Sequence, residues 1–136
     1  MTYLLIGGTG KTAMRAAALL AGAKKPFVLA SRRGPDATPN GYSAIRFDWT
    51  DESTWTRAFD HGPLQAVYMM EPQVDKPWLP MMKFVDLAKQ KGVPRFILCA
   101  GTSTALGKDG MGRVWEHFVS SSVDYAVLRP SWFMGA

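Results

Sequence analysis

A glycine-rich segment near the N-terminus has the spacing Gly7-x-x-Gly10-x-x-Ala13. It follows an apolar run and precedes an alanine-rich stretch, an order that is typical of a first strand, a tight turn and a first helix. Glycines let the backbone reverse and approach a pyrophosphate, and free N–H groups at the start of the helix would face that anion. The alternative is an ordinary strand-to-helix turn. A P-loop is excluded, because Leu5 stands where that motif requires its first glycine.

A second chemical signal follows the apolar residues 26–30, where the chain continues with Ser31, Arg32 and Arg33. In dinucleotide-binding folds the end of the second strand meets the adenosine ribose. An acidic residue there would bond the 2′-hydroxyl, whereas an arginine accommodates a 2′-phosphate. Ser31 with Arg32 therefore indicates NADP rather than NAD, and the alternative is a solvated loop of positive charge before Gly34.

Acidic and aromatic side chains form the third group of candidates. Glu71 and Asp75 follow the fourth apolar run, and they could protonate an epoxide or another leaving oxygen if burial favoured their protonated forms. Trp49 and Trp132 fall in turns after strands, where aromatic faces could stabilise a carbocation and exclude water. His117 is a further candidate proton carrier, although its place on the polar flank of a helix is more often that of a solvated side chain. Two histidines and one cysteine at scattered positions predict no metal site.

The elements that must position these residues alternate along the chain between runs of strand length and segments of helical period. This alternation predicts an α/β fold with a doubly wound, Rossmann-like parallel sheet of about six strands in the order 3-2-1-4-5-6. Ligands of such sheets lie beyond the carboxyl ends of the strands. The expected strands are residues 2–6, 26–30, 43–47, 64–70, 93–100 and 125–129, and the expected helices begin near residues 11, 51, 78 and 111.

Length and composition favour a single domain over residues 1–136, large enough to bury a core without metals or disulfides. The lone Cys99 lies in an apolar run and is typical of a core residue in a reducing compartment. No stretch predicts a membrane span or a signal peptide, so a soluble, cytoplasmic protein is expected. The net charge of +5 comes from scattered bases, which disfavours nucleic acid as a partner and fits an anionic small molecule.

Several motifs together resemble the NmrA-like, atypical short-chain dehydrogenases, in particular the fungal festuclavine synthase and agroclavine dehydrogenase group. The resemblance covers essentially the whole chain, and it implies a fungal pathway of alkaloid biosynthesis. The motifs are residues 7–12, 30–32, 46–51, 84–86 and 128–134. The cofactor contacts that the resemblance implies are phosphates at Gly7, Thr9, Gly10 and Lys11, the 2′-phosphate at Ser31 and Arg32, and the adenine region at Asp48 and Trp49.

Members of this group are about twice as long, and the resemblance implies that their second half roofs the nicotinamide and the alkaloid. The chain is therefore expected to be a truncated domain with an open crevice. Trp132, Phe133 and Met134 would be apolar and exposed in a monomer, which predicts a homodimer. The tyrosine with a lysine four residues later, usual in short-chain dehydrogenases, is absent here. The group that the chain resembles also lacks this pair.

Three interpretations of function remain. The preferred one is a non-redox, acid-assisted rearrangement, isomerisation or cyclisation of an aromatic alkaloid, because the missing parts all serve nicotinamide chemistry. The alternative is an NADPH-dependent reductase of an iminium or enone that dimerisation completes, and the glycine turn with Arg32 favours it. A third is a non-catalytic regulator that binds NADP.

Overall fold

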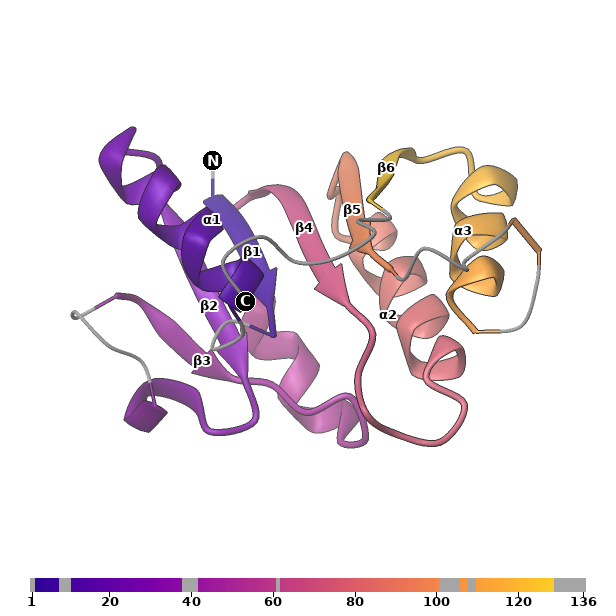
Figure 1. Ribbon diagram of the computed structural model, residues 1–136, viewed down its shortest axis with the longest axis horizontal. Helices are drawn as coiled ribbons and strands as arrows, with labels where there is room; N and C mark the ends of the chain where they lie inside the picture. The colour runs from indigo at the N-terminus through magenta and orange to yellow at the C-terminus, as the bar shows by residue number, and fades with distance from the viewer. Residues whose placement is uncertain are drawn as a thin grey trace.

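The protein is built on one parallel sheet, seen in a computed structural model that describes residues 2–7, 11–37, 42–60, 62–100, 106–107 and 110–128. Within these residues the sheet has six strands in the order β3-β2-β1-β4-β5-β6, and every pairing is parallel (Figure 1). The expected topology is therefore confirmed. The strands are β1 (Thr2–Ile6), β2 (Phe27–Ser31), β3 (Ala44–Arg46), β4 (Leu64–Met70), β5 (Arg95–Cys99) and β6 (Asp124–Leu128).

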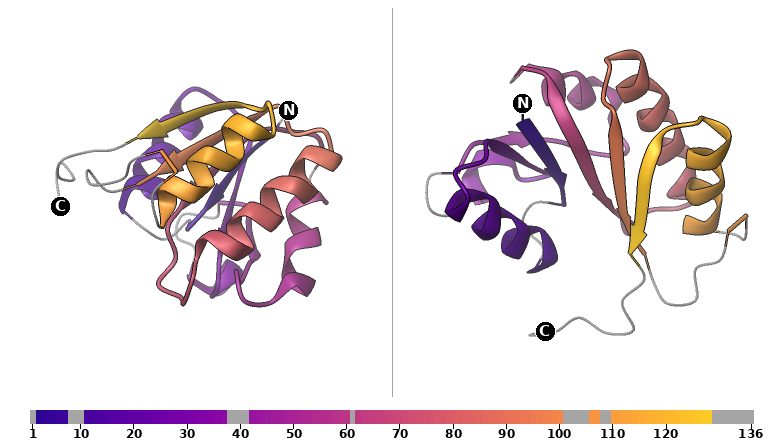
Figure 2. Two further views of the ribbon diagram at one scale, coloured as in Figure 1. Left: turned by 90° about the vertical axis from the view of Figure 1, so that its right-hand side faces the viewer. Right: turned by 90° about the horizontal axis from the view of Figure 1, so that it is seen from above.

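Helices lie on both faces of the sheet (Figure 2). The helix α1 (Lys11–Gly22) packs the small residues Ala13 and Ala17 against Leu5 and Leu29 on one face. The other face carries the 3-10 helix η2 (Glu52–Phe59), α2 (Trp78–Gln90) and α3 (Met111–Ser120), whose apolar sides form one core with the strands. A short 3-10 helix, η1 (Gly34–Ala37), follows β2. The inner strands β1, β2, β4 and β5 are largely buried on both faces, which explains why they are almost continuously apolar, whereas the edge strand β6 is mostly exposed.

An aromatic cluster fills the core where β3, η2 and α2 meet. Phe84 is completely buried, and its ring centroid lies 5.2 Å from that of Phe47, 5.6 Å from Trp49 and 5.7 Å from Trp55. All three contacts are edge-to-face, the arrangement that aromatic quadrupoles favour. Trp49 is only 8% exposed, so the expectation that it offers a free aromatic face to a cation is corrected. Its ring packs into the core because the chain turns inward after β3.

Membrane-spanning helices, metal-ligand clusters and the lone cysteine can be checked in the described part of the chain. None of its helices combines the length and the apolar character that crossing a bilayer requires. The same residues contain no group of three or more His, Cys, Asp or Glu side chains that could hold a metal ion. Cys99 is a free, buried thiol in the core cluster that also contains Ala13 and Ala17 of α1, as expected of a core residue.

Candidate functional site

A hollow of about 370 Å³ lies beyond the carboxyl ends of β1, β2 and β4. It is the crevice where the strand order reverses, which is the usual ligand position in a doubly wound sheet. Six of the residues predicted from the sequence line it: Gly7, Ser31, Arg32, Asp48, Trp49 and Glu71. Residues 72–74 of the loop after β4 complete one wall.

Gly7 gives the turn after β1 its shape. Its φ is +85°, in the left-handed region that favours glycine, and its N–H donates a 2.8 Å hydrogen bond to the backbone oxygen of Ala30. The end of β1 is thereby tied to the end of β2. Thr9 and Gly10 lie outside the described residues, and Lys11 begins α1 with a side chain that is not described.

Ser31 joins the turn after β2 to β3. Its Oγ accepts a 3.1 Å hydrogen bond from the backbone N–H of Gly34, and its backbone oxygen accepts one of 2.8 Å from Phe47. Ser31 also stands opposite Arg46 in the parallel register. Arg32 follows as an exposed side chain at the edge of the hollow. This geometry places two guanidinium groups, from Arg32 and Arg46, on neighbouring strand ends.

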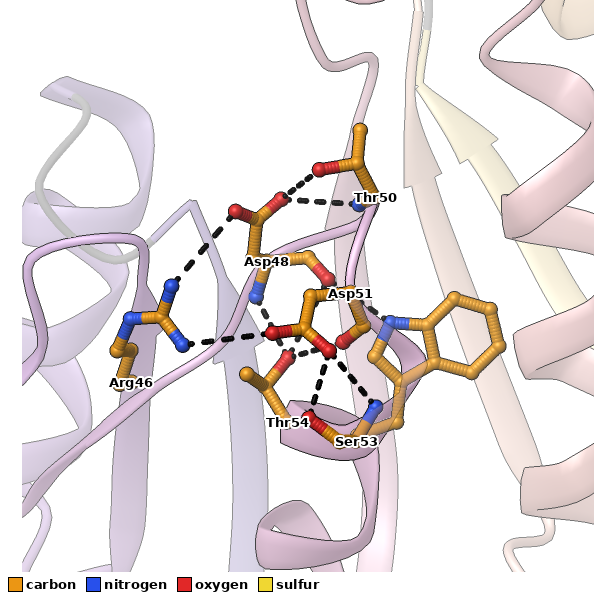
Figure 3. Close-up of polar contacts among 7 residues, drawn as sticks. Arg46, Asp48, Thr50, Asp51, Ser53 and Thr54 are labelled. Atoms are coloured by element: carbon orange, nitrogen blue, oxygen red, sulfur yellow. Dashed lines mark hydrogen bonds and ion pairs between the residues drawn. The ribbon is translucent and has the colours of Figure 1, made fainter.

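Asp48 stands at the start of an ordered turn after β3 (Figure 3). Its Oδ1 accepts hydrogen bonds from the backbone N–H of Thr50 at 2.9 Å and from the Thr50 hydroxyl at 2.7 Å. These two bonds, with smaller contributions from the positive charges of Arg46 and Arg32, hold the pKa of Asp48 below its usual value. The carboxyl group is therefore ionised near neutral pH and can only accept hydrogen bonds.

The rest of this turn is anchored to the core. The Thr54 hydroxyl donates to the backbone oxygen of Asp51 at 2.7 Å and accepts from the backbone N–H of Asp48 at 2.9 Å. Asp51 caps η2, since its Oδ1 accepts hydrogen bonds from the backbone N–H of Ser53 at 3.1 Å and from its hydroxyl at 2.6 Å (Figure 3). These hydrogen bonds hold the turn that borders this side of the hollow in one conformation.

The other predicted acids and the histidine are placed differently. Glu71 lines the hollow, whereas Asp75 lies further along the same loop, and both side chains are exposed to water. His117 lies in the last turn of α3, where its Nε2 is 2.7 Å from Oδ1 of Asp86 on α2. Because α3 connects two parallel strands, its last turn lies at the opposite end of the sheet from the hollow. The interpretation of His117 as a proton carrier at this site is therefore wrong, and Trp132 lies outside the described residues.

Sequence reasoning did not single out Arg46, which pairs with the Asp48 of the hollow. Its Nη2 is 3.9 Å from Oδ2 of Asp48, and its Nη1 is 3.9 Å from Oδ2 of Asp51. The available signal was its place two residues before an aspartate at the end of a strand, since alternate residues of a strand share a face. The loop residues Gln73 and Val74 also line the hollow, and nothing in their types indicates a binding role.

The fold and the hollow define a Rossmann-type protein. Triphenylmethane reductase of Citrobacter sp., complexed with NADP(H), superposes with a TM-score of 0.77 at 12% identity, covering 98% of this chain and 50% of that chain. At such low identity the likeness shows the shared fold alone. No family model matches the chain.

Two curated proteins give a more specific relationship. Festuclavine synthase I of Penicillium roqueforti is 42% identical over 141 residues, which cover 98% of this chain and 48% of that protein. Agroclavine dehydrogenase of Claviceps fusiformis is 39% identical over 139 residues, covering 98% of this chain and 47% of that protein. The chain therefore spans about half the length of the curated relatives it matches. The resemblance to the festuclavine synthase and agroclavine dehydrogenase group is confirmed over that half.

These relatives overturn the preference for a non-redox isomerase or cyclase. Agroclavine dehydrogenase and a further relative, a festuclavine dehydrogenase of Aspergillus fumigatus that is 38% identical, are named as dehydrogenases, so they support the reductase interpretation better than the rearrangement. The preference was wrong because it treated the parts missing from a short chain as evidence about its chemistry. A match to about half of each relative carries no such information.

Proposed function

We propose that this chain forms the dinucleotide-binding part of an NADPH-dependent oxidoreductase that reduces an iminium or enone in a fungal alkaloid pathway. One observation carries the proposal: β2 ends at the hollow in Ser31 and not in an acidic residue, and Arg32 follows it at the edge of the hollow. That pattern suits a 2′-phosphate and lacks the carboxylate that would bond a 2′-hydroxyl. Relatives named festuclavine dehydrogenase and agroclavine dehydrogenase support the redox class and the alkaloid substrate.

The residues of the hollow fit the phosphate-bearing end of this cofactor. The positive φ of Gly7 turns the backbone away from β1 without a side chain, so a pyrophosphate could approach the start of α1. Thr9, Gly10 and Lys11 would add the phosphate contacts that the family resemblance implies. The planar guanidinium of Arg32 could donate two parallel hydrogen bonds to a phosphate.

The opposite wall suits the adenine. Asp48 stays ionised because Thr50 and two arginines stabilise its charge, and an acceptor-only carboxylate matches an exocyclic amino group. Trp49 adds an apolar edge that the core holds in place. Bound NADPH would supply a hydride to the acceptor, while these side chains hold the dinucleotide in one orientation.

Glu71 has a role that differs from the acid catalysis expected of it. It borders the hollow directly after β4, and its side chain is exposed. An exposed carboxylate at this rim would attract a cationic substrate such as an iminium. Asp75 is exposed in the same loop and would add to the same field.

The test is a titration of the chain with NADPH and with NADH, followed by tryptophan fluorescence because Trp49 borders the hollow. Turnover of iminium and enone alkaloids is then measured from the nicotinamide absorbance, for this chain and for a polypeptide extended to the length of the relatives. We expect NADPH binding by the chain and stoichiometric NADPH oxidation by the extended protein. If neither polypeptide binds NADPH, the proposal is refuted. If both bind NADPH but neither turns over a substrate, the result favours a regulator that binds NADP.

A further inference from the structure

The guanidinium of Arg46 faces the carboxylates of Asp48, which lines the hollow, and of Asp51 (Figure 3). Its Nη2 is 3.9 Å from Oδ2 of Asp48, and its Nη1 is 3.9 Å from Oδ2 of Asp51. Both distances exceed that of a charge-assisted hydrogen bond, which is about 2.7–2.9 Å. The guanidinium therefore acts on the two carboxylates mainly through its charge.

The strand register brings this group next to the residues proposed for the 2′-phosphate. Arg46 stands opposite Ser31 in the pairing of β2 with β3. A Cβ built on Gly34 would lie 3.2 Å from the Cβ of Arg46, so the turn that contains Arg32 rests directly on it. The charge of Arg32 also contributes to the lowered pKa of Asp48, which shows that these groups lie within each other's electrostatic field.

Two carboxylates beside a phosphate site disfavour phosphate binding electrostatically, and a nearby guanidinium reduces this effect. Asp48 and Asp51 would repel an incoming phosphate dianion, and Arg46 offsets part of their negative charge. A 2′-hydroxyl is neutral and responds little to the same field. A change in the charge at position 46 should therefore affect NADPH and NADH unequally.

We propose that Arg46 is a specificity-determining residue, which neutralises Asp48 and Asp51 and so permits a 2′-phosphate to bind at Arg32. The inference rests on the proposed function, because it requires a dinucleotide in this hollow. Arg46 acts through its two carboxylate partners and needs no contact with the cofactor. Its side chain is 46% exposed, so its replacement leaves the core intact.

The experiment compares dissociation constants for NADPH and NADH in the wild-type chain and in Arg46→Gln, at low and at moderate salt. NADPH affinity should fall roughly five- to tenfold while NADH affinity changes less than about twofold. The difference should shrink as salt screens it. Arg95→Gln is the matched control, because it removes an arginine that pairs with Asp124 at 2.8 Å at the opposite end of the sheet. It should leave the ratio of the two affinities unchanged.

A charge-compensating variant separates this role from a structural one. Asp51→Asn combined with Arg46→Gln should recover most of the NADPH affinity, because asparagine caps a helix about as well as aspartate. Arg46→Lys should retain the preference for NADPH. An equal loss for both nucleotides in Arg46→Gln, or no recovery in the double variant, would overturn the inference.

The outcomes also distinguish this inference from the function on which it rests. A wild-type chain that binds NADPH, with an unchanged affinity ratio in Arg46→Gln, overturns the role of Arg46 alone. A wild-type chain that binds neither nucleotide overturns the proposed function and the inference together. Melting curves of each variant establish that the affinities belong to folded protein.

Discussion

The indole Nε1 of Trp55 donates a 3.0 Å hydrogen bond to the backbone oxygen of Asp48. Trp55 is 2% exposed and packs within the aromatic cluster around Phe84, whereas Asp48 lines the hollow. This bond therefore joins those of Thr54 in connecting the core to the turn that borders the candidate site. The position of the Asp48 carboxylate therefore depends on packing that lies behind it.

Replacing Trp55 with phenylalanine tests this connection. Trp55→Phe keeps an aromatic ring but removes one donor from the Asp48 carbonyl, which still accepts from the backbone N–H of Asp51 at 3.0 Å. The free energy of unfolding should fall by about 0.5–1.5 kcal/mol. Urea denaturation measures the change. Trp78→Phe is the control, because Trp78 is partly exposed beneath Arg113 at the start of α2, and its replacement should cost less. Equal losses in the two variants would contradict a special role for the bond.

Asp48 should make the stability of the protein depend on pH. Its native pKa is lowered, chiefly by the two Thr50 hydrogen bonds, so the native state favours the ionised form. The stabilisation is present above the unfolded pKa of about 3.9 and is lost as the pH falls through the lower native value. Asp48→Asn should therefore be destabilising at pH 7, and its difference from wild type should shrink below about pH 4.

Urea unfolding at pH 7, 5 and 3 measures this dependence. Thr50→Val removes one of the two donors, so it should lose part of the same pH-dependent stabilisation. A difference between Asp48→Asn and wild type that stays constant from pH 7 to 3 would show that the charge of Asp48 contributes nothing.

Gly7 should be intolerant of a side chain for a backbone reason. A Cβ at this position would lie 3.8 Å from the Cβ of Met70, which is ordinary contact, but the φ of +85° disfavours any L-residue. Gly7→Ala should cost about 1–2 kcal/mol in the free energy of unfolding. Gly22→Ala is the control, because a Cβ there meets open space at the end of α1 and alanine favours helix. Similar losses for both would argue against strain at Gly7.

Arg32 should contribute directly to the binding of NADPH. Arg32→Ala removes a guanidinium from the edge of the hollow, so NADPH affinity should fall by roughly tenfold while NADH affinity changes little. Isothermal titration measures both. Arg57→Ala removes an equal charge from an exposed position in the last turn of η2 and should have little effect. NADPH binding that is unaltered in Arg32→Ala would reject the assignment of the 2′-phosphate.

We propose that two copies of the chain associate through Trp132, Phe133 and Met134, which lie outside the described residues. Light scattering after gel filtration should then give twice the 15.0 kDa mass of one chain. Replacing the three apolar residues with serine should return the mass to that of a single chain. A wild-type mass of one chain removes the proposal.

Much of the fold was predictable because its signals are local. The bounds of β1 and β4 agree with the expected segments 2–6 and 64–70 residue for residue, and α2 begins at the expected residue 78. Buried strands and amphipathic helices each impose a period on their own sequence, so composition within one segment is sufficient. The glycine turn and Arg32 were equally predictable from the sequence, because each directly follows a strand that its own period identifies.

The sequence by itself therefore determined the order of the strands, the edge of the sheet at which a ligand would lie and the positive charge there. Only the tertiary structure decided that Trp49 belongs to the core, that His117 pairs with Asp86 away from the hollow, and that Arg46 stands between two carboxylates. Each of these depends on strand register or on the direction of a helix between segments distant in the chain. Such neighbours are set by packing in three dimensions, because no local period specifies which side chain will face another.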